Sequence, residues 1–474
     1  MLFNSLTFLV FFAIVFTLHR LMPSWTAQKR VLLAASYLFY AAWNPPYVAI
    51  LLFSTTLDWW LARKIWQNAV PGQRKLLLLL SLLSNLGLLS FFKYGNFLLG
   101  NFRTALAAIG VIYQPPALDI ILPIGISFYT FASLSYTIDV YRREVQGHWS
   151  FLDYALFVSF FPHLVAGPIV RAKQLLPQIV QPRQASRDQL GWGLVLVCFG
   201  LFSKVVMADN IFAPVVDQVF TDPAAHNVVD SWAAVLGFSG QIYFDFSGYT
   251  LCAIGLALCF GFEFPDNFRH PYGARGFSDF WRRWHITLST WLRDYLYIPL
   301  GGSRKGKRRT YIDLALTMLI GGLWHGASWM FVLWGGLHGL YLAIERWLRE
   351  NFSRHAPPGD GQPKPQIILT LFTFLVVSLT WIPFRAPDVR AAGNVFMGLF
   401  RFRSFSAVDL LSMLPVYIAI AITVRWHIAL RDSSLEAQFS RLGTVAQTSV
   451  LGLCLVTLFL CSGGDERAFI YFQF

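Results

Sequence analysis

The stretch LTMLIGGLWHGASWMFVLWGGLHGLYL (316–342) contains no aspartate, glutamate, lysine or arginine. Such a run is long enough to cross a hydrocarbon core of about 30 Å at about 1.5 Å per residue. We therefore expect an apolar membrane helix here. Its basic side chains are His325 and His338, and because a polar group at membrane depth is costly, each requires either a structural partner or a function.

The whole chain has the composition of a membrane protein. Of its 474 residues, 55% are hydrophobic, 17% aromatic and only 13% charged, against about 25% charged in soluble domains. Further apolar runs recur along the chain and predict an all-α polytopic membrane protein with roughly ten to thirteen membrane helices. We expect a single integral membrane domain over 1–474, and the polar, proline-rich loop 354–365 is a candidate hinge before the last helices.

The net charge and the absence of common catalytic motifs exclude several classes of function. The formal net charge of +13 suits a protein that contacts membrane lipid or phosphorylated ligands, and we expect no nucleic-acid partner. The five cysteines lie in apolar runs without paired spacing, so we expect neither a disulfide framework nor a metal site. No G-x-S-x-G, Walker, H-E-x-x-H or G-x-G-x-x-G motif is present, which excludes the common hydrolase, nucleotide-triphosphatase, zinc-protease and dinucleotide-binding classes.

His325 has the surroundings of a functional histidine. Gly321 and Gly322 precede it, and Trp324 and Gly326 flank it. Glycines allow another backbone or a ligand to approach closely. An imidazole in a low-dielectric setting stays neutral near pH 7 and can accept a proton. We therefore predict that His325 is catalytic.

The second histidine of this run has a different expected role. In a continuous helix, 13 positions separate His325 from His338, which corresponds to about 20 Å of rise and roughly 220° of rotation. The two could not then share one small carbonyl centre, so we expect His338 to serve packing. His285, on a different segment, could approach His325 from across a cavity.

The stretch EFPDNFRHPYGARGFSDFWRRWHITLSTWLRDYLYIPLGGSRKGKRRT (263–310) alternates arginine and lysine with aromatic residues. This pattern predicts an amphipathic helix at the inner membrane face, followed by a basic loop. Two explanations of the charge remain open. It could contact anionic lipid, or it could bind the phosphates of an acyl-carrier cofactor through residues such as Arg304, Lys305 and Lys307.

One acidic residue lies deep in an apolar context. Asp245 sits in QIYFDFSGYT (241–250) among aromatic residues, and a buried carboxylate requires a partner. It could cap a helix or pair with an arginine to fix the packing, or it could belong to an active site. The sequence leaves both alternatives open.

Five motifs occur together in one order along nearly the whole chain. They are LPIGISFYTF (122–131), SFFPHLVAGPIVR (159–171), QIYFDFSGYT (241–250), FWRRWHITLSTWLRDYLYIPLGG (280–302) and GGLWHGASW (321–329). With these motifs the chain resembles the bacterial membrane-bound O-acyltransferases of the alginate O-acetylation type. The resemblance implies a ring of tilted helices around a central tunnel, in the bacterial inner membrane.

The resemblance also implies roles for particular residues. The histidine of the W-H-G motif, His325 here, is the residue held essential for acyl transfer in that family, and His285 lines the same tunnel. Trp324, beside the essential histidine, would contact the donor. The implied donor is a cytoplasmic acetyl thioester, with acetyl-CoA expected, and His325 would act as general base on an incoming hydroxyl.

The implied product is an O-acetylated exopolysaccharide of the alginate or cellulose type. Members of this branch work with a periplasmic or membrane-anchored acetyltransferase partner of the SGNH type, which completes the transfer. Two other functions remain open on the sequence. One is acyl transfer to teichoic acids, and the other is secondary transport, which would be expected to show two related halves.

Overall fold

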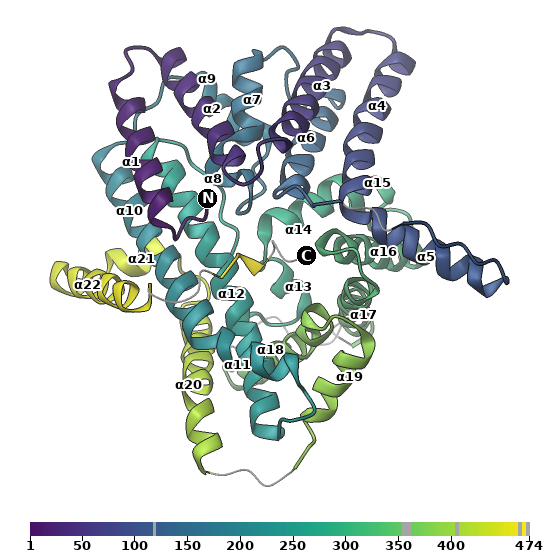
Figure 1. Cartoon of the computed structure of the whole chain (residues 1–474), viewed down its shortest axis with the longest axis vertical. Helices are drawn as coiled ribbons and strands as arrows, with labels where there is room; N and C mark the ends of the chain where they lie inside the picture. The colour runs from purple at the N-terminus through teal and green to yellow at the C-terminus, as the bar shows by residue number, and fades with distance from the viewer. Residues whose placement is uncertain (117–119, 353–362, 403–406, 463–466, 471–474) are drawn as a thin grey trace. The chain divides into compact units, whose positions relative to one another are not determined.

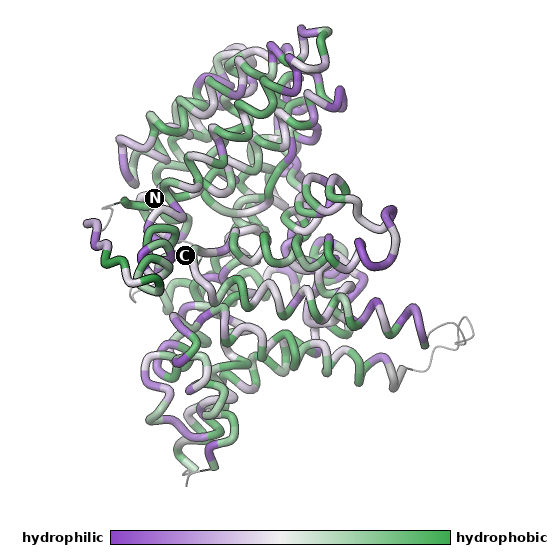
Figure 2. The backbone as a smooth tube through the Cα atoms, turned by 90° about the vertical axis from the view of Figure 1, so that its right-hand side faces the viewer, coloured by the Kyte–Doolittle hydropathy of each residue, from purple (hydrophilic) through white to green (hydrophobic). Residues whose placement is uncertain are grey.

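The computed structural model describes residues 1–116, 120–352, 363–402, 407–462 and 467–470, and every regular element in these ranges is helical (Figure 1). Hydrophobic residues line most of the helices (Figure 2). The all-α polytopic fold class is therefore confirmed. Most of the candidate hinge 354–365 lies outside the described residues, and its last three residues begin a helix.

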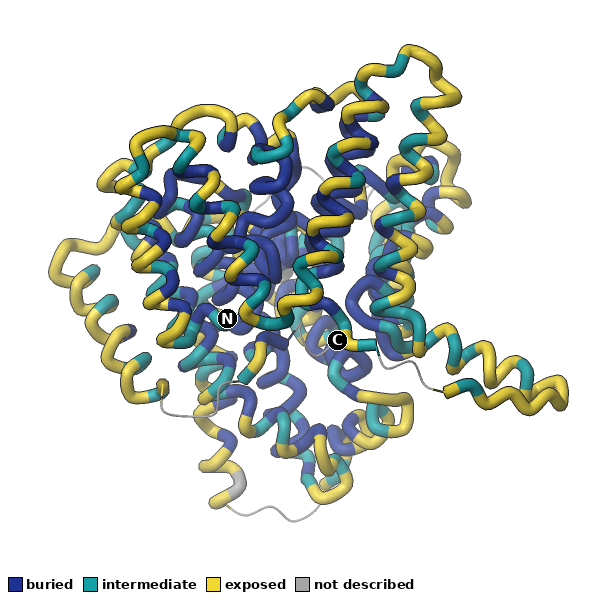
Figure 3. Tube along the Cα trace, turned by 45° about the horizontal axis from the view of Figure 1, so that its top comes forward, coloured by how far each residue is buried: buried dark blue, intermediate teal, exposed yellow. Residues whose placement is uncertain are grey.

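Among the described residues, six helical segments are long and apolar enough to cross a membrane by length and composition. They are Pro71–Ala108, Arg187–Thr221, Val228–Cys259, Gln366–Arg385, Leu410–Ala429 and Thr444–Cys461. Their burial differs widely: Val228–Cys259 is mostly buried, whereas Cys454 is the one buried residue in the described helix Thr444–Cys461 (Figure 3). Apolar side chains that face outward on so many helices are what a lipid environment requires.

The chain divides into two compact units. Unit 1 comprises Met1–Val197 and Leu251–Pro265. Its elements are α1 (Leu6–Leu21), α2 (Trp25–Ala41), α3 (Tyr47–Gln67), α4 (Pro71–Leu89), the π-helical η1 (Ser90–Tyr94), α5 (Gly95–Ala108), α6 (Ile126–Tyr141), α7 (Phe151–Ser159), α8 (Phe161–Leu164), α9 (Ala172–Val180) and most of α10 (Arg187–Leu201). Serines cap several of these helices; Ser5 and Ser24, for example, accept backbone N–H groups of α1 and α2.

A polar cluster joins three neighbouring helices of unit 1, α3, α4 and α6 (Figure 1). Asp58 is fully buried, and its two carboxylate oxygens accept from the Ser81 hydroxyl (2.6 Å) and the Asn85 amide (2.7 Å). Ser81 also lies 3.2 Å from the Thr137 hydroxyl. Both oxygens of the buried carboxylate thus have donors, which is the condition for a structural role.

Unit 2 comprises Cys198–Thr250 and Asp266–Phe474. Its elements are η2 (Phe202–Phe212), α11 (Ala213–Thr221), most of α12 (Val228–Cys259), η3 (Pro271–Gly273), α13 (Phe277–Trp281), α14 (Ile286–Leu292), η4 (Arg293–Tyr297), α15 (Ile298–Leu300), α16 (Lys307–His325), α17 (Trp329–Phe352), α18 (Pro363–Arg385), α19 (Val389–Gly398), α20 (Ala407–Ala429), α21 (Leu435–Ser440) and α22 (Thr444–Cys461). A core rich in aromatic residues packs among α12, α13, α17, α18 and α20.

The expected continuous helix over 316–342 is wrong. α16 ends at His325, and α17 begins at Trp329, so the apolar run folds into two packed helices. A Cβ at Gly322 would clash with the carbonyl oxygen of Phe331 and approach the backbone of Gly335 within about 3 Å. The two helices pack this closely because both positions lack a side chain.

The expected amphipathic helix over 263–310 is also wrong. The segment forms the short helices η3 and α13 and then a helical run over 286–300 in which α14, η4 and α15 follow one another directly. Several of its large or charged side chains are buried, including Trp284 (1% exposed), His285 (0%) and Arg283 (8%). The segment therefore enters the interior of unit 2 instead of lying along its surface.

Candidate active site

His325 ends α16 inside a shell of aromatic rings. Its side chain is 4% exposed. The imidazole lies edge-on to the rings of Trp324, Trp334 and Phe384, with centroid separations of 4.9, 5.0 and 5.3 Å. These rings come from α16, α17 and α18, so three helices enclose the histidine. A shell of this kind excludes water from the imidazole.

His285 lies at the turn before α14. Its backbone is left-handed (φ 43°), which is unusual for a residue other than glycine. The backbone N–H of Thr287 donates to Oδ1 of Asn267 (3.2 Å), and this identifies the amide oxygen. The His285 Nδ1, 3.1 Å from the same oxygen, must therefore carry the proton and donate it.

The other ring nitrogen of His285 is consequently an acceptor. Nε2 is buried, and no hydrogen-bond donor reaches it from the described residues. His285 lies outside the six candidate membrane spans, and burial lowers the pKa of its imidazole to about 3. Phe246 packs edge-on against the ring at 4.6 Å. The chain thus holds a neutral imidazole with a buried lone pair that accepts no hydrogen bond from the described residues.

Trp324 brings the two predicted histidines into one cluster. The centroid of its ring lies 4.9 Å from that of His325 and 5.9 Å from that of His285. The three side chains come from two segments about 40 residues apart in the sequence. We call His285, Trp324 and His325 the histidine cluster.

His338 is closer to this cluster than a continuous helix would allow. Because α17 folds back along α16, the ring of Trp334 contacts both His338 (4.7 Å) and His325 (5.0 Å). The expected separation of about 20 Å therefore does not apply. The His338 Nε2 lies 3.3 Å from the Thr380 hydroxyl, and its ring packs against Trp281 at 5.1 Å. These contacts suit a packing role.

The predicted donor-binding residues of the basic loop do not reach the histidines. Arg304, Lys305 and Lys307 are all exposed. Lys305 donates to the carbonyl of Leu300 (3.5 Å), and Lys307 lies 3.6 Å from the carboxylate of Glu350. Since Lys307 and His325 are opposite ends of α16, about 27 Å of helix separates them.

Asp245 pairs with a lysine instead of an arginine. The Nζ of Lys204 lies 2.5 Å from Oδ1 of Asp245, and the backbone N–H of Ile470 donates to Oδ2 (2.8 Å). The preceding residue, Phe469, packs against Phe246 at 5.6 Å. Asp245 therefore anchors the segment 467–470 next to the ring that contacts His285, and this favours the structural alternative.

Sequence reasoning missed Asn267 because a single asparagine 18 residues before its partner has no local signal. It also missed the break after His325, for which Gly326 and Ser328 were available signals. The Ser328 hydroxyl accepts the backbone N–H of Met330 at the start of α17. Within the part of the chain that the structure describes, no group of three His, Cys, Asp or Glu side chains could hold a metal ion.

The sequence profile of the membrane-bound O-acyltransferase family matches residues 34–382. The chain belongs to this family. The match includes both histidines of the cluster and contains residues of both units. The expectation of a multi-pass membrane acyltransferase is therefore confirmed.

Similar proteins indicate the branch of the membrane-bound O-acyltransferase family to which the chain is related. A probable alginate O-acetylase AlgI of Azotobacter vinelandii is 41% identical over 415 residues, which cover 86% of this chain and 80% of the relative. The protein of the same name in Pseudomonas putida is 38% identical over the full length of both chains. A peptidoglycan O-acetyltransferase of Helicobacter pylori is 35% identical over 94% of this chain and 91% of its own. The resemblance to the alginate O-acetylation type and the prediction of an O-acetyltransferase are confirmed.

Proposed function

We propose that the chain transfers acetyl groups from a cytoplasmic thioester donor, acetyl-CoA, toward an exopolysaccharide outside the inner membrane. The observation that carries the proposal is the histidine cluster, in which two buried imidazoles flank one tryptophan. Support also comes from relatives named as alginate and peptidoglycan O-acetylating enzymes. The polymer is of the alginate or cellulose type, and residues 1–474 act as one integral membrane domain.

His325 acts as the general base. Its imidazole takes the proton of an acceptor hydroxyl, the hydroxyl oxygen attacks the carbonyl carbon of the acetyl thioester, and the thiolate leaves and takes up a proton. A positioned base of this kind typically contributes about 10²–10⁴-fold. The apolar ring shell excludes water that would hydrolyse the thioester.

His285 orients one of the reactants. Its Nε2 has a lone pair, is buried and is held in a fixed direction by the bond from Nδ1 to Asn267. An acceptor in this position can take a hydrogen bond from the incoming hydroxyl or from an amide of the donor. Trp324 lies between the two histidines and would contact the acetyl group.

The immediate acceptor belongs to a periplasmic or membrane-anchored partner of the SGNH type, which passes the acetyl group to the polymer. Membrane lipid surrounds the exposed apolar helices. The donor enters from the side of the basic loop, where Arg304, Lys305 and Lys307 attract its phosphates by charge and do not contact its thioester.

The test is the acetate content of the secreted polymer in cells that lack the gene and are complemented with wild-type or His325→Ala protein at matched membrane levels. Wild-type protein should restore alkali-labile acetate, and His325→Ala should not. His338→Ala, whose contacts are those of a packing residue, serves as the matched control and should retain most of the acetate. Normal acetylation in cells without the gene would refute the proposed function.

A further inference from the structure

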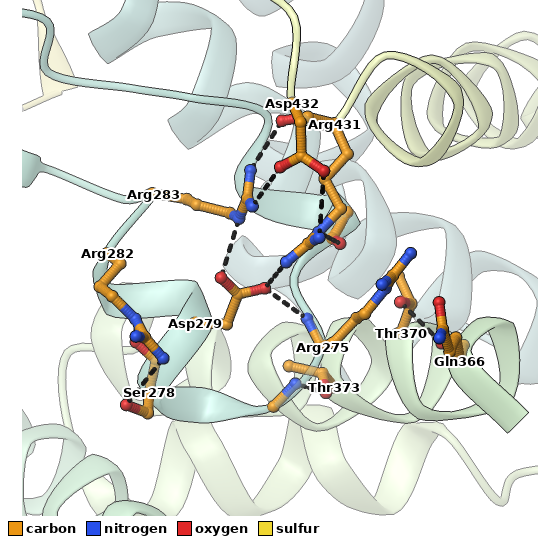
Figure 4. A network of polar contacts seen from close by, with 12 residues as sticks. Arg275, Ser278, Asp279, Arg282, Arg283, Gln366, Thr370, Thr373, Arg431 and Asp432 are labelled. Carbon is orange, nitrogen blue, oxygen red and sulfur yellow. Dashed lines mark hydrogen bonds and ion pairs between the residues drawn. The ribbon is translucent and has the colours of Figure 1, made fainter. Parts of the chain in front are cut away.

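A cluster of arginines surrounds one carboxylate on α13 (Figure 4). Oδ2 of Asp279 accepts from the backbone N–H of Arg275 (2.8 Å) and from Arg431 (2.5 Å), and Oδ1 accepts from Arg283 (3.0 Å). Asp432 lies 2.8 Å from Arg283 and 3.3 Å from Arg431. Two of the arginines are thus each held by two carboxylates.

The central carboxylate remains ionised. Burial alone would raise the pKa of Asp279, but hydrogen bonds from the Arg275 amide, Arg431 and Arg283 lower it below its usual value. Asp279 therefore fixes the positions of Arg283 and Arg431 at neutral pH. The cluster is a preorganised basic surface and not a set of mobile side chains.

Two further guanidinium groups of this cluster form no ion pair among the described residues, although Arg275 lies near enough to Asp432 for its charge to lower the pKa of that carboxyl. Arg275 and Arg282 are exposed. Arg282 donates only to the backbone carbonyl (3.2 Å) and hydroxyl (3.4 Å) of Ser278, and no carboxylate among the described residues forms an ion pair with either. The planar guanidinium fork matches the geometry of a phosphate group. The two arginines are therefore available to an anionic ligand.

The distance from this surface to His325 can be measured along α17. At one end, the backbone N–H of Ser278 donates to the carboxylate of Glu345 (2.9 Å). At the other, the ring of Trp334 contacts His325 (5.0 Å). Glu345 follows Trp334 by 11 residues, so about 16 Å of helix axis lies between the residue that contacts Ser278 and the residue that contacts His325.

This separation matches a particular class of donor. In phosphopantetheine, roughly thirteen bonds link the sulfur to the phosphorus, and at about 1.2 Å of extension per bond they span about 15 Å. The basic loop lies further away, because Lys307 contacts Glu350, 16 residues beyond Trp334, or about 24 Å along the same helix. The surface that carries Arg275 and Arg282 therefore matches the length of the phosphopantetheine chain better than the basic loop does.

We propose that Arg275 and Arg282 bind the phosphate groups of a phosphopantetheine thioester such as acetyl-CoA, while Asp279 positions the surface on which they lie. This inference rests on the proposed function, because it assumes that the thioester is presented at His325. The headgroup phosphate of an anionic lipid would offer the same chemistry to the two arginines, so the experiment must separate the two sources.

The experiment measures equilibrium binding of CoA and of pantetheine, which lacks phosphate, to the full-length protein in phosphatidylcholine bilayers. Arg275→Gln and Arg282→Gln should each raise the Kd for CoA about tenfold and leave the Kd for pantetheine unchanged. Arg282→Lys keeps the positive charge but loses the planar guanidinium group. Its Kd for CoA should lie between those of the wild type and Arg282→Gln. Arg269→Gln, whose guanidinium already pairs with Asp266 (2.9 Å), is the matched control and should change neither value.

Three outcomes would overturn the phosphate site. These are unchanged CoA affinity in both glutamine variants, equal weakening of CoA and pantetheine, or a defect confined to bilayers that contain phosphatidylglycerol, which would assign the arginines to lipid. Acetyl transfer from acetyl-CoA by the wild-type protein is measured in parallel. Its absence would refute the proposed function, whereas normal transfer with unaltered CoA affinity in the variants would refute only the phosphate site.

Discussion

The polar cluster of unit 1 and the histidine cluster of unit 2 both bury polar side chains, but they satisfy them differently. Around Asp58, both carboxylate oxygens have donors, from Ser81 and Asn85. In His285, one nitrogen is bonded to Asn267 and the other is buried without a donor from the described residues. A fully satisfied cluster specifies how helices pack. A partly satisfied one keeps a lone pair available for a ligand, at a cost in stability.

The comparison predicts first that His285→Ala lowers the rate of acetyl transfer by more than tenfold, since it removes the buried acceptor. Asn267→Ala should lower the rate less, because the imidazole remains but loses the partner that fixes its direction. Both rates are measured in membranes that contain acetyl-CoA, the partner proteins and the polymer.

His148→Ala, which removes an exposed histidine, controls for nonspecific effects and should keep the wild-type rate. Equal rates for wild-type and His285→Ala protein would mean that the unpartnered nitrogen has no part in the reaction.

Second, Asp58→Ala should lower the stability and leave the rate per folded molecule unchanged. Truncation leaves the donors Ser81 and Asn85 buried without their acceptor, which costs about 1–3 kcal/mol. Thermal unfolding in detergent, monitored alongside transfer activity, measures both quantities. If Asp58→Ala protein lost activity at an unchanged unfolding temperature, the polar cluster of unit 1 would have a functional role, contrary to the comparison.

Third, a triple replacement of Arg304, Lys305 and Lys307 with glutamine should have the smallest effect. These exposed charges attract the donor without contacting its thioester, so KM for acetyl-CoA should rise only about two- to threefold, and more at low salt. An unchanged KM with reduced membrane yield would assign the loop to lipid alone.

The fold class, the family and the two histidines of the cluster could be predicted from the sequence. Hydropathy reports the cost of burying a residue, and His325 stood out because it lies in an apolar run. Hydropathy does not report where a run breaks. The turn after His325 contains only Gly326, Ala327 and Ser328. The break signals of Gly326 and Ser328 were not weighed against the apolar run, so His338 was placed about 20 Å away.

The contact partners of these residues could not be predicted from the sequence, for a different reason. Asn267 and Trp334 contact the histidines through packing of separate segments, and nothing near them in the sequence encodes that contact. The arginines of 263–310 were visible as charge, but the pairing of Arg283 with Asp432 depends on a residue 149 positions away. Long-range pairing decides which charges are neutralised and which remain for a ligand.

The measurement that tests the central claim most directly is the rate of transfer of labelled acetyl groups from acetyl-CoA by His325→Ala protein, with its unfolding temperature measured in the same preparation. We predict a loss of at least about 100-fold, equivalent to roughly 3 kcal/mol in the barrier, at an unfolding temperature close to that of the wild type. A rate within a few fold of the wild type, in protein that is equally well folded, would contradict the assignment of His325 as the general base.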